Sequence, residues 1–154
     1  MAKKELLIEV DAIEVFDRIR EQTELIGKKS STDGDYENKS MDSNERSIFD
    51  RYFAIACSEI TDTFAHYLSS DDSNVDAASY TLLMPSTYKS SSNYALNNAV
   101  ATFLYNKVVA LWMEVVDKER MPEFNVLAES ARVNVRRLLL SKEVHAPEHD
   151  EEVD

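Results

Sequence analysis

The chain has 154 residues, of which 44% are hydrophobic and 30% charged, and its formal net charge is −12 at pH 7. This length favours a single domain with one core, and two glycines with three prolines are too few for the many tight turns of an all-β sandwich. The single cysteine excludes an internal disulfide framework and fits a reducing compartment, and the acidity disfavours generic DNA binding, which requires a basic surface.

The N-terminal part of the chain predicts a strand followed by a helix. Leu6 to Val10 is a short apolar run typical of a strand. Asp11 is a candidate N-cap, with Glu14 three residues later as in a capping box. We expect this helix to end near Leu25, with Gly27 as its stop.

A polar stretch, residues 27–42, separates this helix from the next, and we interpret it as a functional or partly disordered loop. The second helix is predicted to start near Asp42 or Ser43. The run Ser69 to Ser73 is a loop signal that closes it. Its apolar positions recur at helical spacing: Phe49, Tyr52 or Phe53, Ala56, Ile60, Phe64 and Tyr67.

The segment Ser79 to Met84 predicts a second strand, because it combines β-prone residues with a closing proline, Pro85. This strand could pair with Leu6 to Val10 in a small two-stranded sheet packed on the helices.

Two long helices are predicted at the C-terminal end, with a short joint between them. The first, around Ala95 to Val116, is apolar on nearly every side and must be wrapped by other elements or by other subunits. The second, around Pro122 to Leu140, is amphipathic, and its proline costs little in the first turn. Its predicted core stripe is Phe124, Leu127, Ala131, Val135 and Leu138. The predicted fold is therefore mainly α, a four-helix bundle-like domain with a small two-stranded β element.

No targeting or membrane segment is predicted. The apolar run Leu6 to Ile8 is too short for a signal-peptide core. The longest apolar stretch is interrupted by Asn106, Lys107 and Glu114, which predicts a poor membrane span. We therefore expect synthesis in the cytosol.

The charge is unevenly distributed, and we expect a single helical domain, residues 1–142, followed by an acidic, flexible tail, residues 143–154. The tail holds six of the acids and no Lys or Arg. The preceding segment, Lys118 to Lys142, holds six basic residues against three acids: Lys118, Arg120, Arg132, Arg136, Arg137 and Lys142, against Glu119, Glu123 and Glu129.

One group of residues on the second helix has metal-binding chemistry. Glu59, Asp62 and His66 share a helix face and could hold a divalent cation. Carboxylate sites in bundles usually need matching ligands on a facing helix, and the later helices supply only glutamates without a histidine. A solvated helix face is the favoured interpretation, and no metal ligand is assigned.

Cys57 has no base within reach along its helix, so a buried structural cysteine is favoured over a nucleophile. His145 and His149 lie in the acidic tail, and weak metal binding there is treated as incidental. The chain has no Gly-rich phosphate loop, G-x-S-x-G, C-x-x-C or H-E-x-x-H motif. We therefore predict a protein without catalytic residues or a cofactor, not an enzyme.

Several side chains are candidates for contacts between subunits. Trp112 belongs to an aromatic group that fits either the core or a subunit contact. Tyr88 and Tyr94 flank a serine run and are candidate interface anchors. The outward basic residues of the last helix, Arg132, Arg136 and Arg137, complete this predicted interface.

The order of these pieces resembles that of small proteins from tailed phages and prophages of Bacteroidetes-type hosts. The segments that carry the resemblance are Leu6 to Asp11, Thr23 to Lys29, the aromatic-rich Ile48 to Leu68, Tyr80 to Pro85 with Tyr88, Val108 to Trp112, and Ala128 to Arg132. One departure is the C-terminus, where a basic segment is expected and an acidic tail follows Arg136 and Arg137.

The resemblance implies a structural virion protein, a head–tail connector or adaptor of the neck or tail-completion type. Such a subunit would act as a ring of copies between portal and tail or neck proteins, in the neck or tail region of the virion and in the host cytoplasm during assembly. It would bind no sequence-specific nucleic acid and no membrane. Two alternatives stay open: an acidic protein-binding module or regulator that mimics DNA, and a small helical metalloprotein built on Glu59, Asp62 and His66.

Overall fold

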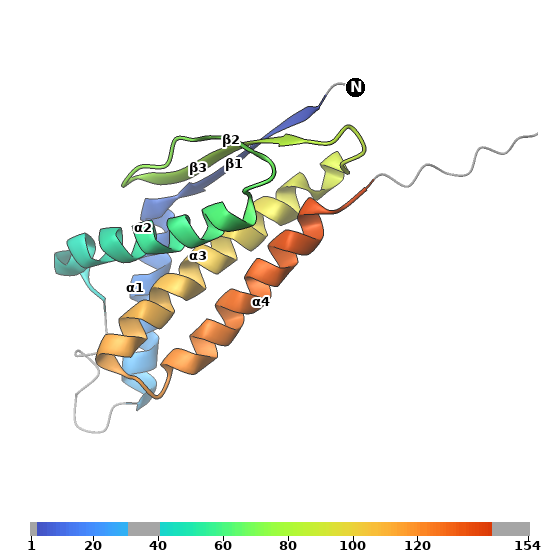
Figure 1. Cartoon of the computed structure of the whole chain (residues 1–154). Helices are drawn as coiled ribbons and strands as arrows, with labels where there is room; N and C mark the ends of the chain where they lie inside the picture. Colours follow the sequence, from blue (N-terminus) through green and yellow to red (C-terminus); the bar gives the residue numbers. More distant parts are fainter. Residues whose placement is uncertain (1–2, 31–40, 143–154) are drawn as a thin grey trace, which may run out of the picture.

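The computed structural model describes residues 3–30 and 41–142, which form four helices and a three-stranded antiparallel sheet. In chain order the elements are β1 (Lys4–Asp11), α1 (Ala12–Ser30), a 3₁₀ turn (Ser43–Glu45), α2 (Arg46–Thr63), β2 (Leu68–Asp71), β3 (Ala77–Met84), a second 3₁₀ turn (Ser90–Ser92), α3 (Asn93–Val116) and α4 (Met121–Leu139). In Figure 1, α3 and α4 lie side by side as a long antiparallel pair, α2 crosses them, and the sheet covers one end of the helical layer. The predicted mainly α fold with a small β element is confirmed.

The sheet has the order β1-β3-β2 and contains the predicted strand pair. Leu6 lies opposite Leu82 and Ile8 opposite Tyr80, so the alternating apolar side chains of both strands point into the core together. The third strand, β2, was not predicted, because its sequence LSSD reads as a loop. Its side chains are largely exposed, and main-chain pairing with β3 holds it, with a register shift between Leu68 and Ser70. Helix α2 accordingly ends at Thr63, earlier than expected.

Helix α1 starts where the sequence predicts but continues further. The backbone N–H of Ile13 donates to Asp11 Oδ1 at 2.8 Å, which confirms Asp11 as the cap. The helix runs to Ser30, past the expected stop at Gly27, since a glycine inside a helix costs only about 1 kcal/mol. Asp42 and Glu45 form a complete capping box before α2.

Helix α3 is the centre of the core, and the chain itself buries most of it. It contacts α1, α2, α4 and β1, so the other elements supply the wrapping that its apolar sequence demands. Its buried residues are Leu96, Ala99, Val100, Phe103, Leu104, Tyr105, Asn106, Val108, Val109, Ala110, Trp112 and Met113.

The segment Ser90–Val116 is also long and apolar enough to cross a membrane by length and hydropathy alone, and 61% of its most apolar stretch is buried inside the domain. The interruptions at Asn106, Lys107 and Glu114 therefore do not lower its hydropathy below that of a span, contrary to the expectation. Asn106 is itself buried, and its Nδ2 donates to the Thr102 carbonyl at 3.0 Å. The core helix of a folded domain is buried to a similarly high degree.

Helix α4 buries one face against α3 and α2. The buried residues follow a 4-3-4-3 spacing: Phe124, Ala128, Ala131, Val135 and Leu138, with Leu139. Leu127 was predicted in this stripe, but it is 50% exposed because the small Ala128 occupies the inward position. Pro122 lies in the first turn, as expected.

Candidate functional site

The outer side of α4 carries a second apolar stripe, which no other described element covers. Val126 is 64% exposed, Val133 is 54% exposed and Leu140, just after the helix, is 67% exposed. These positions are seven residues apart, or about two helical turns, so their side chains lie in one row. We call this row and its polar neighbours, Glu129, Ser130, Arg136 and Arg137, the outer α4 face.

A helix usually turns one apolar face to the core and a polar face to water. Helix α4 departs from this, because its inner stripe already packs on α3 while Val126 and Val133 face away from the core. Between them lies a hollow of about 410 Å³, lined by Val126, Glu129, Ser130 and Val133. This exposed apolar row beside charged residues is a candidate contact surface for another protein.

The charged residues around this row are arranged asymmetrically. Arg137 Nη2 and Nε donate to Asn134 Oδ1 at 2.6 and 3.1 Å, and the Arg136 and Arg137 side chains remain exposed. Arg132 is partly buried, with Nη1 3.9 Å from Glu59 Oε1 and Nε 3.9 Å from Glu129 Oε1. The C-terminal end of α4 is therefore basic, while Glu129 lies nearer its middle.

A broader groove lies beside this face, between the N-terminal half of α3 and the middle of α4. It encloses about 700 Å³, and Tyr94, 80% exposed, stands at its rim. Small side chains of α3 and the exposed Leu127 of α4 form much of its wall: Ala95, Ala99, Thr102, Leu127, Ser130 and Ala131. Tyr94 is the one predicted tyrosine anchor that the structure leaves accessible, among the two proposed.

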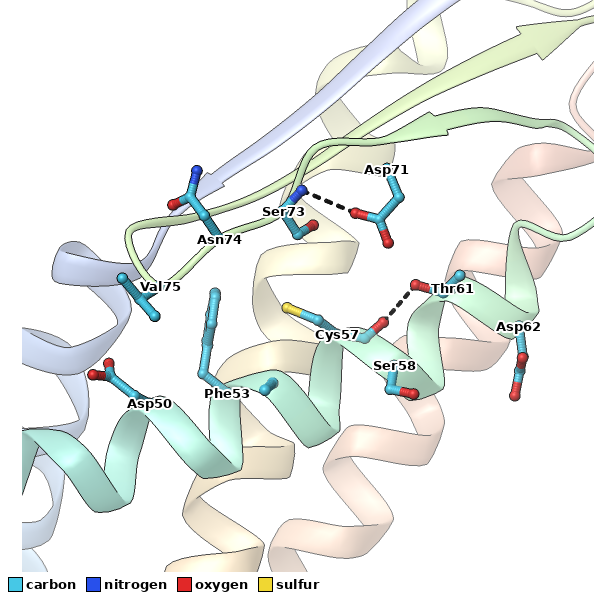
Figure 2. A pocket seen from close by; sticks show the side chains of 11 residues that line it. Asp50, Phe53, Cys57, Ser58, Thr61, Asp62, Asp71, Ser73, Asn74 and Val75 are labelled. Atoms are coloured by element: carbon cyan, nitrogen blue, oxygen red, sulfur yellow. Dashed lines mark hydrogen bonds between the residues drawn. The ribbon is translucent and has the colours of Figure 1, made fainter.

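A second hollow, of about 510 Å³, lies between α2 and the turn that joins β2 to β3 (Figure 2). Its apolar lining comes from Phe53, Ala54, Cys57 and Val75. Three aspartates on its margin make it acidic: Asp50, Asp62 and Asp71. Asp50 pairs with Arg46 at 2.8 Å, and Asp71 accepts a hydrogen bond from the Ser73 backbone N–H at 3.0 Å.

The chemistry of this second hollow does not suit nucleophilic catalysis. Burial raises the pKa of Cys57 to about 11, so its thiol stays protonated at neutral pH. The hollow has no lining histidine, lysine or arginine that could act as a base or stabilise a thiolate. Burial raises the pKa of Tyr80 as well, and its hydroxyl donates to the Cys57 carbonyl at 3.0 Å. Cys57 is thus a buried structural cysteine, which was the favoured interpretation from sequence.

The structure separates the residues of the predicted interface. Trp112 and Tyr88 are 5% and 2% exposed, so both belong to the core of this chain and are not accessible on its surface. Tyr88 instead fixes Lys142, near the C-terminal end of the domain, because the two residues form a β-bridge. Its carbonyl oxygen also accepts a hydrogen bond from Lys4 Nζ at 2.7 Å. Tyr94, Arg136 and Arg137 remain accessible.

The predicted metal group does not assemble. Among the described residues no set of three or more His, Cys, Asp or Glu side chains could hold a metal ion. Glu59 is instead paired with cations, at 3.1 Å from Lys107 Nζ and 3.9 Å from Arg132 Nη1. His66 lies in the turn after α2 rather than on the helix itself. The metalloprotein alternative therefore has no assembled site at Glu59, Asp62 and His66. His145 and His149 lie outside the described residues.

Sequence reasoning missed the exposed row Val126, Val133 and Leu140. The signal was present as a second apolar repeat on the same helix, but the first stripe alone already accounted for the packing of the helix on the core. Comparison with protein-family models, curated proteins and solved structures finds none that matches this chain.

Proposed function

We propose that this chain is a structural, non-enzymatic subunit that works by assembling with copies of itself and with other proteins. The observation that carries the proposal is the outer α4 face, an apolar row on a helix whose other face already fills the core. Burying an apolar surface is favourable by roughly 25 cal/mol per Å² of apolar area, and the row does not gain this free energy while it stays in water. A partner that covers the row recovers this free energy.

The sequence resemblance gives this assembly its proposed setting: a head–tail connector or adaptor, of the neck or tail-completion type, in the virion. Its partners would be further copies in a ring, with portal and tail or neck proteins above and below. A ring requires a heterologous contact, in which one surface of a subunit meets a different surface of the next. The groove at Tyr94 and the outer α4 face are two surfaces of different composition on one subunit, and they adjoin at Ser130.

The charges suggest one contact within the ring. Arg136 and Arg137 are exposed at the basic end of α4, and residues 143–154, outside the described part, bring six acids and no Lys or Arg. The acidic tail of one copy would then lie on the basic end of α4 in the next copy. Such a contact between exposed charges weakens as salt rises.

A second candidate function has one observation in its favour. The hollow beside α2 has an apolar lining with three aspartates and no lining Lys or Arg, which suits a basic segment of a partner protein. An acidic binding module of this kind would work as a monomer or dimer. Binding of a basic partner that is lost in Asp62→Lys with Asp71→Lys, while self-association stays intact, would favour it.

Light scattering after size-exclusion chromatography, with electron microscopy of the same fractions, tests the main proposal. We expect particles larger than the 17.6 kDa chain, including rings at high protein concentration. Deleting residues 143–154 should weaken assembly at low salt. Unchanged assembly would contradict the proposed contact between the acidic tail and α4. Flanking genes for portal, capsid or tail proteins would support the virion setting, whereas flanking genes of unrelated function would count against it.

A further inference from the structure

The outer α4 face has an internal symmetry about Val133. Counting outward from it, Val126 lies seven residues before and Leu140 seven residues after, and both are apolar and exposed. Glu129 lies four residues before and Arg137 four residues after, so the charges at matched positions are opposite. The small Ser130 and the long Arg136 occupy the matched positions three residues away. A face with this pattern is complementary to itself when it is turned around.

Two copies of α4 that cross antiparallel at Val133 bring these matched positions together. Residues equally far from the crossing point, on opposite sides, then face each other across the contact. Val126 of each copy meets Leu140 of the other, and the two Val133 side chains meet on the axis. Glu129 of each copy lies beside Arg137 of the other, which gives two equivalent ion pairs.

From this pattern we infer that the free chain pairs with a second copy through the outer α4 face, about a two-fold axis at Val133. The second copy is the occupant because its α4 supplies both the apolar row and, at the positions four residues from Val133, the opposite charge. Within the described part of the chain nothing covers these faces, since Glu129, Ser130, Val133, Arg136 and Arg137 are all exposed. One pair of helices buries less than the roughly 1,200–2,000 Å² of stable complexes, so we expect reversible pairing.

This dimer goes beyond the proposed ring. A ring with a head side and a tail side has no two-fold axis between neighbouring subunits, because such an axis would turn one subunit upside down. The pair would therefore be the form of the free protein, and it covers Arg137, which the proposed ring contact uses. The pair must open before that contact forms, so pairing would hold back ring growth.

Single cysteines on the full-length chain test the axis directly. Val133→Cys should form an intermolecular disulfide with itself under mild oxidation, since both sulfurs lie near the axis and disulfides require Cα atoms about 4.4–6.8 Å apart. Val126→Cys and Leu140→Cys should each cross-link poorly when either variant is oxidised alone. When the two variants are mixed, the introduced cysteine at position 126 of one copy and that at position 140 of the other should form a disulfide. Wild type serves as the background, because its one cysteine is buried. Val115→Cys, at an exposed position of α3, is the matched control.

These outcomes separate the two-fold pair from other contacts. Cross-linking of Val126→Cys with Leu140→Cys only in the mixture, together with self-cross-linking of Val133→Cys, is the result expected. Equal cross-linking of Val115→Cys, or none at Val133→Cys, would overturn the inference. Rings or larger particles without any cross-link at Val133→Cys would overturn the pair and leave the proposed function standing.

Charge exchange gives an independent test by analytical ultracentrifugation. Glu129→Arg and Arg137→Glu, each alone, place like charges opposite each other and should weaken dimerisation by about tenfold or more. The double exchange restores opposite charges and should return the dissociation constant to near the wild-type value. Two single exchanges without effect, or a double exchange that is additive, would contradict the arrangement.

Discussion

The Tyr80 hydroxyl donates a hydrogen bond to the backbone carbonyl of Cys57 across 3.0 Å, joining the central strand β3 to helix α2 inside the core. Thr61 Oγ1 donates to the same carbonyl at 2.8 Å, as a threonine one turn later on a helix often does. Tyr80 is fully buried, and its ring lies 5.1 Å from that of Phe64. This bond thus fixes the sheet on α2, next to the acidic hollow.

Replacing Tyr80 by Phe should destabilise the fold modestly. The Cys57 carbonyl keeps its bond from Thr61, so only one of its two side-chain donors is lost and the expected cost is about 0.5–1.5 kcal/mol. Urea unfolding followed by circular dichroism measures this cost. Tyr52→Phe, at a half-buried position of α2 outside this bond, is the control and should cost less.

Alkaline pH should destabilise the domain. Burial raises the pKa of Cys57 from 9.0 to about 11 and that of Tyr105 from 10.0 to about 12. The folded state therefore holds protons that the unfolded chain releases, so this contribution is full below about pH 9 and is lost as pH rises through the folded pKa values. We expect the free energy of unfolding to fall between pH 8.5 and pH 10.5, the interval to be sampled by urea titration.

The control for the pH effect is Cys57→Ala, which removes the thiol that titrates first. In this variant the decline above about pH 9 should be shallower, although its stability at neutral pH is lower. A free energy of unfolding that stays constant up to pH 10.5 in the wild type would contradict the assignment of protonated, buried groups.

Two substitutions on α4 test which residues face the core. Phe124→Ala removes a buried aromatic ring and should cost about 3–5 kcal/mol, whereas Leu127→Ala, half exposed, should cost much less. Thermal unfolding of both variants gives the comparison. Similar losses for the two would mean that Leu127 lies in the core stripe, as the sequence pattern alone suggested.

The ion pairs of Glu59 should support packing between α2 and the C-terminal helices. Glu59→Gln keeps the shape but removes the charge that faces Lys107 and Arg132, and we expect a loss of about 1 kcal/mol that shrinks in high salt. A chelator should leave the stability of the wild type unchanged. Asp17→Asn is the control, because its pair with Arg20 is more exposed.

Much of the fold follows from periodic apolar patterns. The pairing of Leu6 to Val10 with Ser79 to Met84 is confirmed because both segments place alternate apolar side chains on one face. Strand β2 escaped prediction because main-chain bonds at a sheet edge hold it and its LSSD sequence carries no such pattern. The extension of α1 past Gly27 reflects how little one glycine costs a helix.

The candidate site was harder to predict than the fold. Trp112 and Tyr88 were predicted from the sequence as contact residues. Aromatic side chains suit cores and interfaces equally, and the structure buries both residues in the core. The exposed row became visible only when the structure showed which face of α4 was already used. Valine is an ordinary core residue type, so Val126 and Val133 become candidate contact residues only because they face away from the core.

Light scattering of the full chain across a concentration series, beside Val133→Asp, decides whether the chain self-associates through α4. We expect the wild-type mass to rise above 17.6 kDa with concentration, while Val133→Asp stays monomeric because two carboxylates would meet on the axis. Val115→Asp, an equal change at an exposed position outside the outer α4 face, should assemble like the wild type. A wild-type mass of 17.6 kDa at every concentration, or a Val133→Asp variant that assembles normally, would contradict self-association through α4.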